Sequence, residues 1–267
     1  MTWSVDEIDY AAIDVARVRD NRTLFYLLTS ASFMESGSDT YAGNLARHYA
    51  DTPEAAAWLK QQWEGEELQH GLSLRRYVEH VWPEFDWAAG YERFFGEYRL
   101  TCNDDNLETS RALEMAARCV VETGTASYYR ALEAASDEPV LRELARRISS
   151  DEVRHYKHFF RYFNDLNDRE RHGRLKVLGV IARRLLEIKN DDADISLRNI
   201  LRVERGRDDI PDADVAALNS QCSDMVRHNL PIEMTIKMLL RPLHLHARIE
   251  RLVHRPLVAM VSLAILR

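Results

Sequence analysis

The sequence contains the same pattern of acidic and imidazole side chains twice: a single glutamate, then a Glu-x-x-His motif about thirty residues later. Because residues three apart lie on one face of an α-helix, each motif would direct a carboxylate and an imidazole to one point. Four helices that present these groups to a common axis would supply the six ligands of a carboxylate-bridged dinuclear metal site. The predicted ligands are Glu35, Glu67, His70, Glu122, Glu152 and His155.

The similarity between the two halves extends beyond these ligands. Each single glutamate is followed by a hydroxyl residue, a glycine and a second hydroxyl residue, and a tyrosine lies six positions after the glutamate. The glutamates at positions 35 and 122 are 87 residues apart, and the histidines at positions 70 and 155 are 85 apart. We therefore predict two helical hairpins, related by a pseudo-two-fold axis, that bring both ligand sets to one centre.

A second interpretation is that these charges form ordinary solvated helix faces. It would have to explain two motifs, two upstream glutamates and a shared local sequence. The residues at helical spacing around them are also apolar, so these faces are predicted to point inward. Because a buried carboxylate without a metal ion or partner is strongly unfavourable, we favour metal binding. The apolar neighbours are Met115, Cys119, Ala126 and Tyr129 around Glu122, and Ile148, Phe159 and Tyr162 around the second motif.

The composition favours a helical protein with a large core. The chain has 267 residues, of which 46% are apolar, and only 10 are glycine and 7 are proline. Long stretches rich in Ala, Leu, Glu and Arg favour α-helices. We predict an all-α fold in which residues 1–189 form a four-helix bundle and residues 190–267 add C-terminal helices packed on it.

The cysteines and the first residues bear on the cellular compartment. Cys102, Cys119 and Cys222 are too few and too scattered for a disulfide framework or a zinc site. Cys119 lies three residues before Glu122 and could approach a metal ion, but we interpret it as a small core residue. The N-terminal segment is acidic and lacks the apolar core of a secretory signal. A cytoplasmic protein with reduced thiols is therefore expected.

Apolar periodicity, caps and prolines predict five main helices. The segment Glu84–Thr101 is rich in aromatic residues and is predicted to be a helical connector packed over the bundle. Asn103–Asn106 would cap the third helix. The predicted helices are Asp14–Tyr49, Pro53–Val81, a third that runs from this cap to Ala134, Asp137–Asn164 and Asp168–Lys189. The last of them would bury a stripe of Leu175, Leu178, Ala182 and Leu185.

Charge is segregated along the C-terminal part of the chain. Asn190–Asp214 contains seven aspartates and is predicted to be an acidic, turn-rich connection. Met225–Arg267 contains seven Lys or Arg and two Glu, which gives this segment a net charge of +5. Because the whole chain has a net charge of −7, the remaining residues together carry −12. Its final apolar run of about ten residues is too short to span a bilayer. We predict helices docked on the acidic bundle or on a second subunit, with a membrane or an acidic partner as the alternative.

The local sequences resemble the ferritin-like di-iron carboxylate superfamily and are most similar to the soluble acyl-carrier-protein desaturases. The segment Trp63-Glu64-Gly65-Glu66-Glu67-Leu68-Gln69-His70-Gly71 is similar to that family's Trp-x-x-Glu-Glu-x-x-His-Gly. Asp151-Glu152-Val153-Arg154-His155 is similar to its Asp-Glu-x-Arg-His, and Glu122 with Thr125 to its Glu-x-x-Thr. The resemblance covers about Asp14 to Leu166 and leaves the last hundred residues unmatched.

This resemblance implies a ferritin-like four-helix bundle whose six ligands hold two iron ions, with manganese as an alternative in one or both positions. It implies an oxygen-dependent oxidoreductase acting on a small-molecule or acyl substrate, with electrons from an external donor such as a ferredoxin. Thr125 would lie beside the oxygen-binding side of the metals and take part in catalysis. We expect a homodimer. We do not expect a nucleic-acid partner or insertion into a membrane.

Two further pairs of residues accompany the ligands. Glu66 and Asp151 precede the ligand glutamates and would either orient the ligand histidine of the opposite motif or remain as solvated helix charges. Gly37 and Gly124 would allow either close helix packing or an opening for oxygen. The sequence leaves both questions open.

Other members of the superfamily are less similar. Iron-storage ferritins usually lack the second histidine, and rubrerythrins add a Cys-rich domain, whereas this chain has no Cys-x-x-Cys. The radical-bearing subunit of ribonucleotide reductase has a tyrosine seven residues after the first Glu of Glu-x-x-His, where this chain has Leu74 and, in the second half, Phe159. Enzymes that deformylate aldehydes or oxidise amines share the ligand pattern, so the subtype stays open. The alternative is a non-catalytic protein that binds or stores iron or scavenges peroxide.

Overall fold

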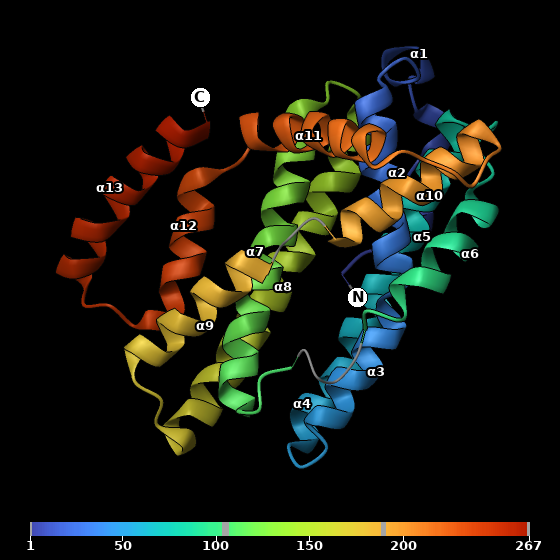
Figure 1. Ribbon diagram of the computed structural model, residues 1–267. Coiled ribbons are helices and arrows are strands. Elements are labelled where there is room, and N and C mark those ends of the chain that lie inside the picture. The colour runs from blue at the N-terminus through green and yellow to red at the C-terminus, as the bar shows by residue number, and fades with distance from the viewer. Residues whose placement is uncertain (1, 103–106, 188–190, 266–267) are drawn as a thin grey trace. The chain divides into compact units, whose positions relative to one another are not determined.

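The computed structural model describes residues 2–102, 107–187 and 191–265 (Figure 1). Every regular element in these ranges is a helix, which confirms the predicted all-α class. The chain divides into two compact units, each assembled from three segments. The predicted division after residue 189 stays a prediction. The first unit contains Met1–Asn106, Ser136–Leu144 and Lys189–Met225, and the second contains Leu107–Ala135, Ala145–Ile188 and Val226–Arg267.

The core of the first unit is a pair of helices, α2 (Arg22–Ser36) and α5 (Glu64–Val81), which pack against each other (Figure 1). The Asn21 side chain caps α2, because its Oδ1 accepts a hydrogen bond from the Leu24 backbone N–H at 3.1 Å. Side chains from α2 that are buried in this core include Leu24, Phe25, Leu28 and Phe33. Their burial supplies much of the hydrophobic stabilisation that holds the two helices together.

The first predicted helix, Asp14–Tyr49, is wrong in its continuity. The chain turns before Asn21, a residue that favours helix caps, and Gly37 separates α2 from the next helix. Glu35 therefore lies in the last turn of α2 rather than in the middle of a long helix. The helices in this stretch are α1 (Val15–Val18), α2 and α3 (Ser38–His48).

The second predicted helix, Pro53–Val81, is confirmed in extent but contains one wider turn. It consists of α4 (Pro53–Trp58), a π-helical turn over Leu59–Trp63, and α5. Pro53 stands in the first turn, where no backbone donor is required. Short π-helical segments occur frequently at functional sites, and this one ends four residues before Glu67.

The aromatic connector forms α6 (Trp87–Tyr98) and packs on α2, as predicted. The Phe33 ring lies 5.4 Å from the Trp87 ring and 5.5 Å from the Phe94 ring, measured between centroids. The Trp87 indole N–H donates to the Ser32 hydroxyl at 2.8 Å. Aromatic area and one buried hydrogen bond thus fix the connector to α2 close to Glu35 in the sequence.

The predicted acidic connection at 190–214 is wrong, because most of it is helical. It contains α10 (Asp191–Arg205) and the start of α11 (Asp212–His228). Leu197, Ile200 and Leu201 lie at helical spacing and are buried where α10 packs on α2 and α6. This apolar stripe outweighs the acidic composition, which only marks the exposed side of the helix.

The second unit is built around α7 (Arg111–Ala135), and α8 (Pro139–Glu170) belongs to it from Ala145 onward. The Ser149 hydroxyl on α8 donates to the Ala126 carbonyl on α7 at 2.9 Å, which links the two helices at a buried position. The cap predicted at Asn103–Asn106 lies outside the described residues.

The fifth predicted helix begins later and buries a different face. Since α8 continues to Glu170, α9 spans Arg174–Glu187 and packs on α7. The predicted stripe is wrong, since Leu175, Leu178 and Leu185 have exposed fractions of 85%, 46% and 44% and Ala182 is exposed too. The buried residues of α9 are Val177, Val180 and Ile181.

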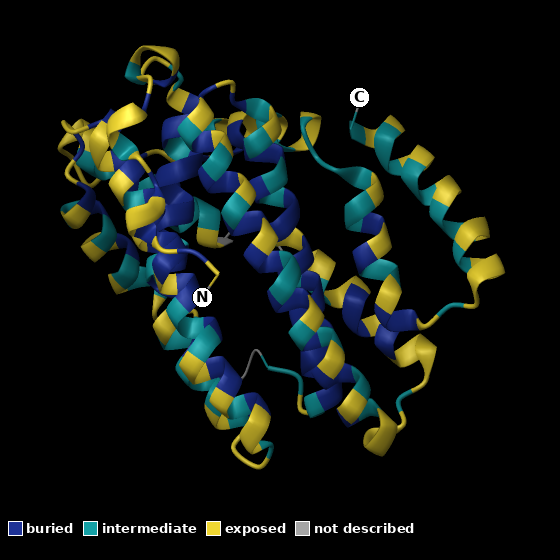
Figure 2. Ribbon diagram, turned by 180° about the vertical axis from the view of Figure 1, so that it is seen from behind, coloured by how far each residue is buried: buried dark blue, intermediate teal, exposed yellow. Residues whose placement is uncertain are grey.

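The C-terminal segment forms α12 (Ile232–Leu240), which packs on α7, and α13 (Ala247–Ile265), which packs on α12. The Thr235 and Ser127 hydroxyls lie 2.7 Å apart, and the Tyr156 hydroxyl donates to the Met238 carbonyl at 2.7 Å. Figure 2 shows only intermediate and exposed residues along the described part of α13, the helix that leads to the C-terminus. Within the described residues, no helix is long and apolar enough to cross a membrane.

Candidate metal centre

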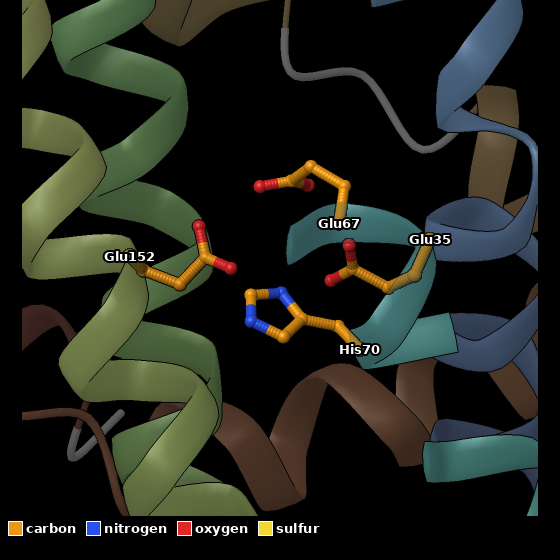
Figure 3. Close-up of side chains that lie close together, drawn as sticks. All are labelled: Glu35, Glu67, His70 and Glu152. Carbon is orange, nitrogen blue, oxygen red and sulfur yellow. The ribbon is translucent and has the colours of Figure 1, made fainter. Parts of the chain in front are cut away.

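The first unit brings together three predicted ligands, which we call the first triad: Glu35 on α2, and Glu67 and His70 on α5 (Figure 3). One donor atom from each lies within 4.8 Å of the others. All three side chains are buried, with exposed fractions of 8%, 8% and 0%. Glu152, also labelled in Figure 3, belongs to α8 and is described with the second unit.

The position of the first triad depends on a close contact between α2 and α5. A Cβ atom added at Gly71 would lie 2.6 Å from the backbone N of Ser36 and 2.9 Å from its Cα. Only glycine therefore allows the two backbones to approach this closely, directly after one ligand histidine and one ligand glutamate. The Tyr91 hydroxyl donates to the Ser36 carbonyl at 2.9 Å and fixes the end of α2.

An aromatic side chain covers the histidine of the first triad. The rings of Trp3 and His70 are nearly parallel, with an interplanar angle of 11° and centroids 6.3 Å apart. Trp3 is itself 6% exposed. No sequence pattern predicts the role of Trp3, because this residue lies far along the chain from both motifs and its contact depends on tertiary folding.

The second unit brings together the other three predicted ligands, the second triad: Glu122 on α7, and Glu152 and His155 on α8. The Nδ1 atom of His155 lies 3.6 Å from Oε2 of Glu122 and 3.8 Å from Oε2 of Glu152. One donor atom from each residue lies within 4.8 Å of the others, and all three are at most 2% exposed. This triad repeats the composition of the first.

Thr125, the predicted catalytic residue, contacts a ligand of the second triad. Its hydroxyl donates to Oε2 of Glu152 at 2.9 Å and also lies 3.3 Å from the carbonyl oxygens of Val121 and Glu122. It can therefore orient one carboxylate oxygen of Glu152 by a charge-assisted hydrogen bond. Its role in catalysis stays a prediction.

The electrostatics of the second triad favour a bound cation. Burial raises the pKa of Glu122, the nearby charge of Glu152 raises it further, and His155 partly opposes the shift. Oε2 of Glu122 accepts no hydrogen bond from the described residues. A divalent cation would offset the unfavourable burial of these carboxylates. Carboxylate oxygens with an imidazole suit iron or manganese, so the donor set fits these metals.

The cysteine nearest to these ligands in the sequence lies in the core. Cys119 is 1% exposed, and burial raises the pKa of its thiol well above the usual value. It therefore stays a neutral thiol, whereas metal ions bind the thiolate. The three cysteines are free.

Glu66 and Asp151, which precede the ligand glutamates, are 0% and 1% exposed. The alternative of solvated helix charges is therefore wrong for both. Oε1 of Glu66 accepts a hydrogen bond from the Gln62 amide at 3.4 Å, and Oδ1 of Asp151 accepts one from the Arg154 guanidinium at 2.6 Å. Their predicted role as orienting groups for the histidines stays a prediction.

The two glycines that follow the single ligand glutamates differ from each other. A Cβ added at Gly37 would be in ordinary contact with the rings of Tyr98 and Phe95, at 3.4 and 3.5 Å. A Cβ added at Gly124 would meet no atom of the described residues within 4 Å. Close helix packing is thus not the reason for glycine at position 124.

A buried ion pair on α7 was missed by the sequence prediction. Glu114 and Arg118 are 0% and 5% exposed, and Arg118 Nε lies 2.7 Å from Oε1 of Glu114. Arg184 of α9 lies 3.8 Å from the other carboxylate oxygen. Burial raises the pKa of Glu114 to about 7 despite this neighbouring positive charge. The four-residue spacing from Glu114 to Arg118 and on to Glu122 was the available signal, because it places all three on one helix face.

Comparison with known proteins assigns no family to the chain. No protein-family model matches it, and no curated protein sequence is significantly similar to it. The chemistry of the site is therefore inferred from the six side chains and their surroundings.

Proposed function

We propose that the six residues of the two triads hold two metal ions in one centre of a ferritin-like four-helix bundle formed by α2, α5, α7 and α8. We further propose that the protein is a di-iron, oxygen-dependent oxidoreductase for an organic substrate such as an acyl chain. One observation carries the proposal. Each unit places two buried carboxylates and one buried imidazole with donor atoms within 4.8 Å of one another.

The sequence repeat supports a single dinuclear centre rather than two separate ion sites. The two triads contain the same residue types in the same order along the chain, as the halves of a pseudo-symmetric bundle do. Charge supports the number of ions, because two divalent cations would neutralise the four carboxylates. Neutralisation matters at buried positions, where unpaired charge is strongly unfavourable.

The ligand set and its neighbours support oxygen chemistry rather than storage. A histidine is present in both triads, the pattern that the desaturase-like motifs share. Iron bound there would activate dioxygen with electrons from an external donor such as a ferredoxin. Burial of the ligands excludes bulk water, Trp3 covers the His70 ring, and the Thr125 hydroxyl holds one oxygen of Glu152.

Metal analysis of purified protein tests this proposal. Protein expressed in iron-rich medium should contain two iron ions per chain, and Glu122→Gln or Glu67→Gln should lower that number. Glu133→Gln on α7 and Glu79→Gln on α5 are matched controls, because these glutamates pair with Arg130 and Arg75 rather than with a ligand. Normal folding without bound metal would contradict the proposal.

A second measurement separates an oxidoreductase from a storage protein. The iron-loaded protein is mixed with oxygen in a stopped-flow instrument. Each pair of iron ions should react with one oxygen molecule, and the protein should consume further oxygen only when reduced ferredoxin is supplied. Uptake of many iron ions per chain, without electron consumption from the donor, would instead identify iron storage.

A further inference from the structure

One side of α13 carries a row of apolar side chains exposed to solvent. Ile249, Leu252, Met260 and Leu263 have exposed fractions of 47%, 75%, 60% and 64%. Their positions place them on one side of the helix, because successive members are separated by whole or nearly whole helical turns. We call these four residues the apolar row. No described residue of α13 is buried.

The opposite side of α13 faces the rest of the second unit. The helix packs on α12, and His254 Nε2 lies 3.4 Å from the Glu233 carbonyl on that helix. Val258, Val261 and Ile265 follow His254 at four-, three- and four-residue spacing, are half-buried and mark this contact side. α13 is therefore attached along one side, and the apolar row faces outward.

Positive charge lies beside the apolar row at the start of the helix. Arg248, Arg251 and Arg255 are exposed, and Glu250 is the one acidic residue of α13. From Pro256 to Ile265 the helix carries no charge. Exposed arginines beside an outward apolar row are typical of helices that lie in the interface of an anionic membrane.

This charge favours an anionic lipid surface over a second copy of the chain. Two α13 helices paired in parallel through their apolar rows would bring equal positive charges together, and like charges in an interface are unfavourable. An antiparallel pair would place the arginines of each helix beside the uncharged half of the other, which offers them no opposite charge. Anionic headgroups would instead attract each exposed arginine.

We propose that α13 binds an anionic lipid surface. The side chains of Leu252, Met260 and Leu263 enter the boundary between headgroups and acyl chains, while Arg251 and Arg255 contact lipid phosphates. The helix lies parallel to the surface and anchors the second unit there through α12 and α7.

Vesicle co-sedimentation of the full-length protein tests this proposal. The protein should sediment with vesicles that contain phosphatidylglycerol and should stay soluble with pure phosphatidylcholine vesicles. Added salt should weaken the binding, because it screens the arginines. Arg251→Glu and Arg255→Glu should each weaken it by about fivefold or more. Leu252→Glu combined with Leu263→Glu should abolish it.

Leu175→Glu combined with Leu186→Glu is the matched control. Leu175 and Leu186 are 85% and 75% exposed and belong to α9 of the same unit, so the double substitution adds the same two negative charges outside the apolar row. This variant should bind vesicles like the unchanged protein, and circular dichroism should show that all variants are folded.

Three outcomes would overturn the proposal. The first is that the unchanged protein does not bind anionic vesicles. The second is that the leucine variant binds them as tightly as the control, since charge alone would then explain the attraction. The third is a dimer, seen by light scattering, that the leucine variant dissociates while vesicle binding is absent, because the apolar row would then join two copies. None of these measurements depends on bound metal.

Discussion

The two triads contain the same residue types but are supported in different ways. In the first, Gly71 allows close contact with the backbone of Ser36, and the Trp3 ring lies on His70. In the second, Thr125 hydrogen-bonds Glu152, and the α7 helix that carries the ligand glutamate also carries a buried ion pair. The first triad therefore depends mainly on shape and the second on charge. A substitution that adds volume should therefore disturb the first triad. Loss of a charge, or a change in pH, should disturb the second triad.

Removing the charge of Arg118 should give the largest effect on the second unit. Arg118→Met leaves the carboxylate of Glu114 buried without its partner at 2.7 Å. Loss of one partner of a buried pair lowers the free energy of unfolding by about 3–5 kcal/mol. The loss should be smaller below pH 6, where Glu114 binds a proton. Urea unfolding at pH 8 and pH 5.5 measures both values.

The double variant Glu114→Met with Arg118→Met is the control for this prediction. Replacement of both partners by apolar side chains is often neutral, so it should recover most of the lost stability. A single variant as stable as the unchanged protein at pH 8 would show that the ion pair does not support the second unit.

Glu114 should also make stability depend on pH in the metal-free protein. Its pKa rises from 4.5 to about 7 on folding, because burial disfavours the carboxylate. The folded state therefore holds the proton more tightly, and stability is greatest below pH 4.5, falls as the pH rises to about 7, and is constant above that. The fall should amount to about 3 kcal/mol. The free energy of unfolding, measured between pH 5 and pH 8, should show this loss in the unchanged protein and not in Glu114→Gln. The same pH dependence in both proteins would exclude a contribution from Glu114.

A small change of volume should damage the first triad. Gly71→Ala places a Cβ atom 2.6 Å from the Ser36 backbone N, so α2 and α5 must move apart. Such overpacking should lower the free energy of unfolding by about 1–3 kcal/mol and reduce iron binding. Gly124→Ala is the matched control in α7, where no described residue lies within 4 Å of the added Cβ atom. There the better helix propensity of alanine should stabilise the protein by up to about 1 kcal/mol. If both substitutions changed the free energy of unfolding and the iron content equally, the first triad would not depend on close backbone contact more than the second.

The local composition of each triad was predictable from the sequence because helical spacing is local. Two residues three apart on a helix share a face whatever the rest of the chain does, so the Glu-x-x-His spacing alone pairs Glu67 with His70. To predict that Glu35 joins Glu67 and His70, one must also assume that α2 packs on α5, and the sequence repeat supports that assumption.

The remaining errors arise where tertiary contacts decide the outcome. The acidic segment after residue 190 was assigned by its aspartates, although Leu197, Ile200 and Leu201 of α10 bury a regular apolar stripe. In α9, a shift of the stripe by two residues moved the predicted core to the exposed side. Trp3 lies 67 residues before His70 in the chain, and no local pattern predicts a contact over such a separation.

The smallest expected effect on stability concerns the hydroxyl of Thr125. Thr125→Val removes the 2.9 Å hydrogen bond to Glu152 with little change in volume, so the free energy of unfolding should fall by about 1 kcal/mol. Iron content should stay at two per chain, because all six predicted ligands remain. If Thr125 acts beside the metals, the variant should react more slowly with oxygen or consume it without oxidising substrate, and Thr125→Ser should restore the rate. Thr123→Val is the matched control, since the Thr123 hydroxyl donates to the Cys119 carbonyl at 2.6 Å rather than to a ligand carboxylate. Oxygen kinetics that are the same in both valine variants would limit Thr125 to holding Glu152 in place.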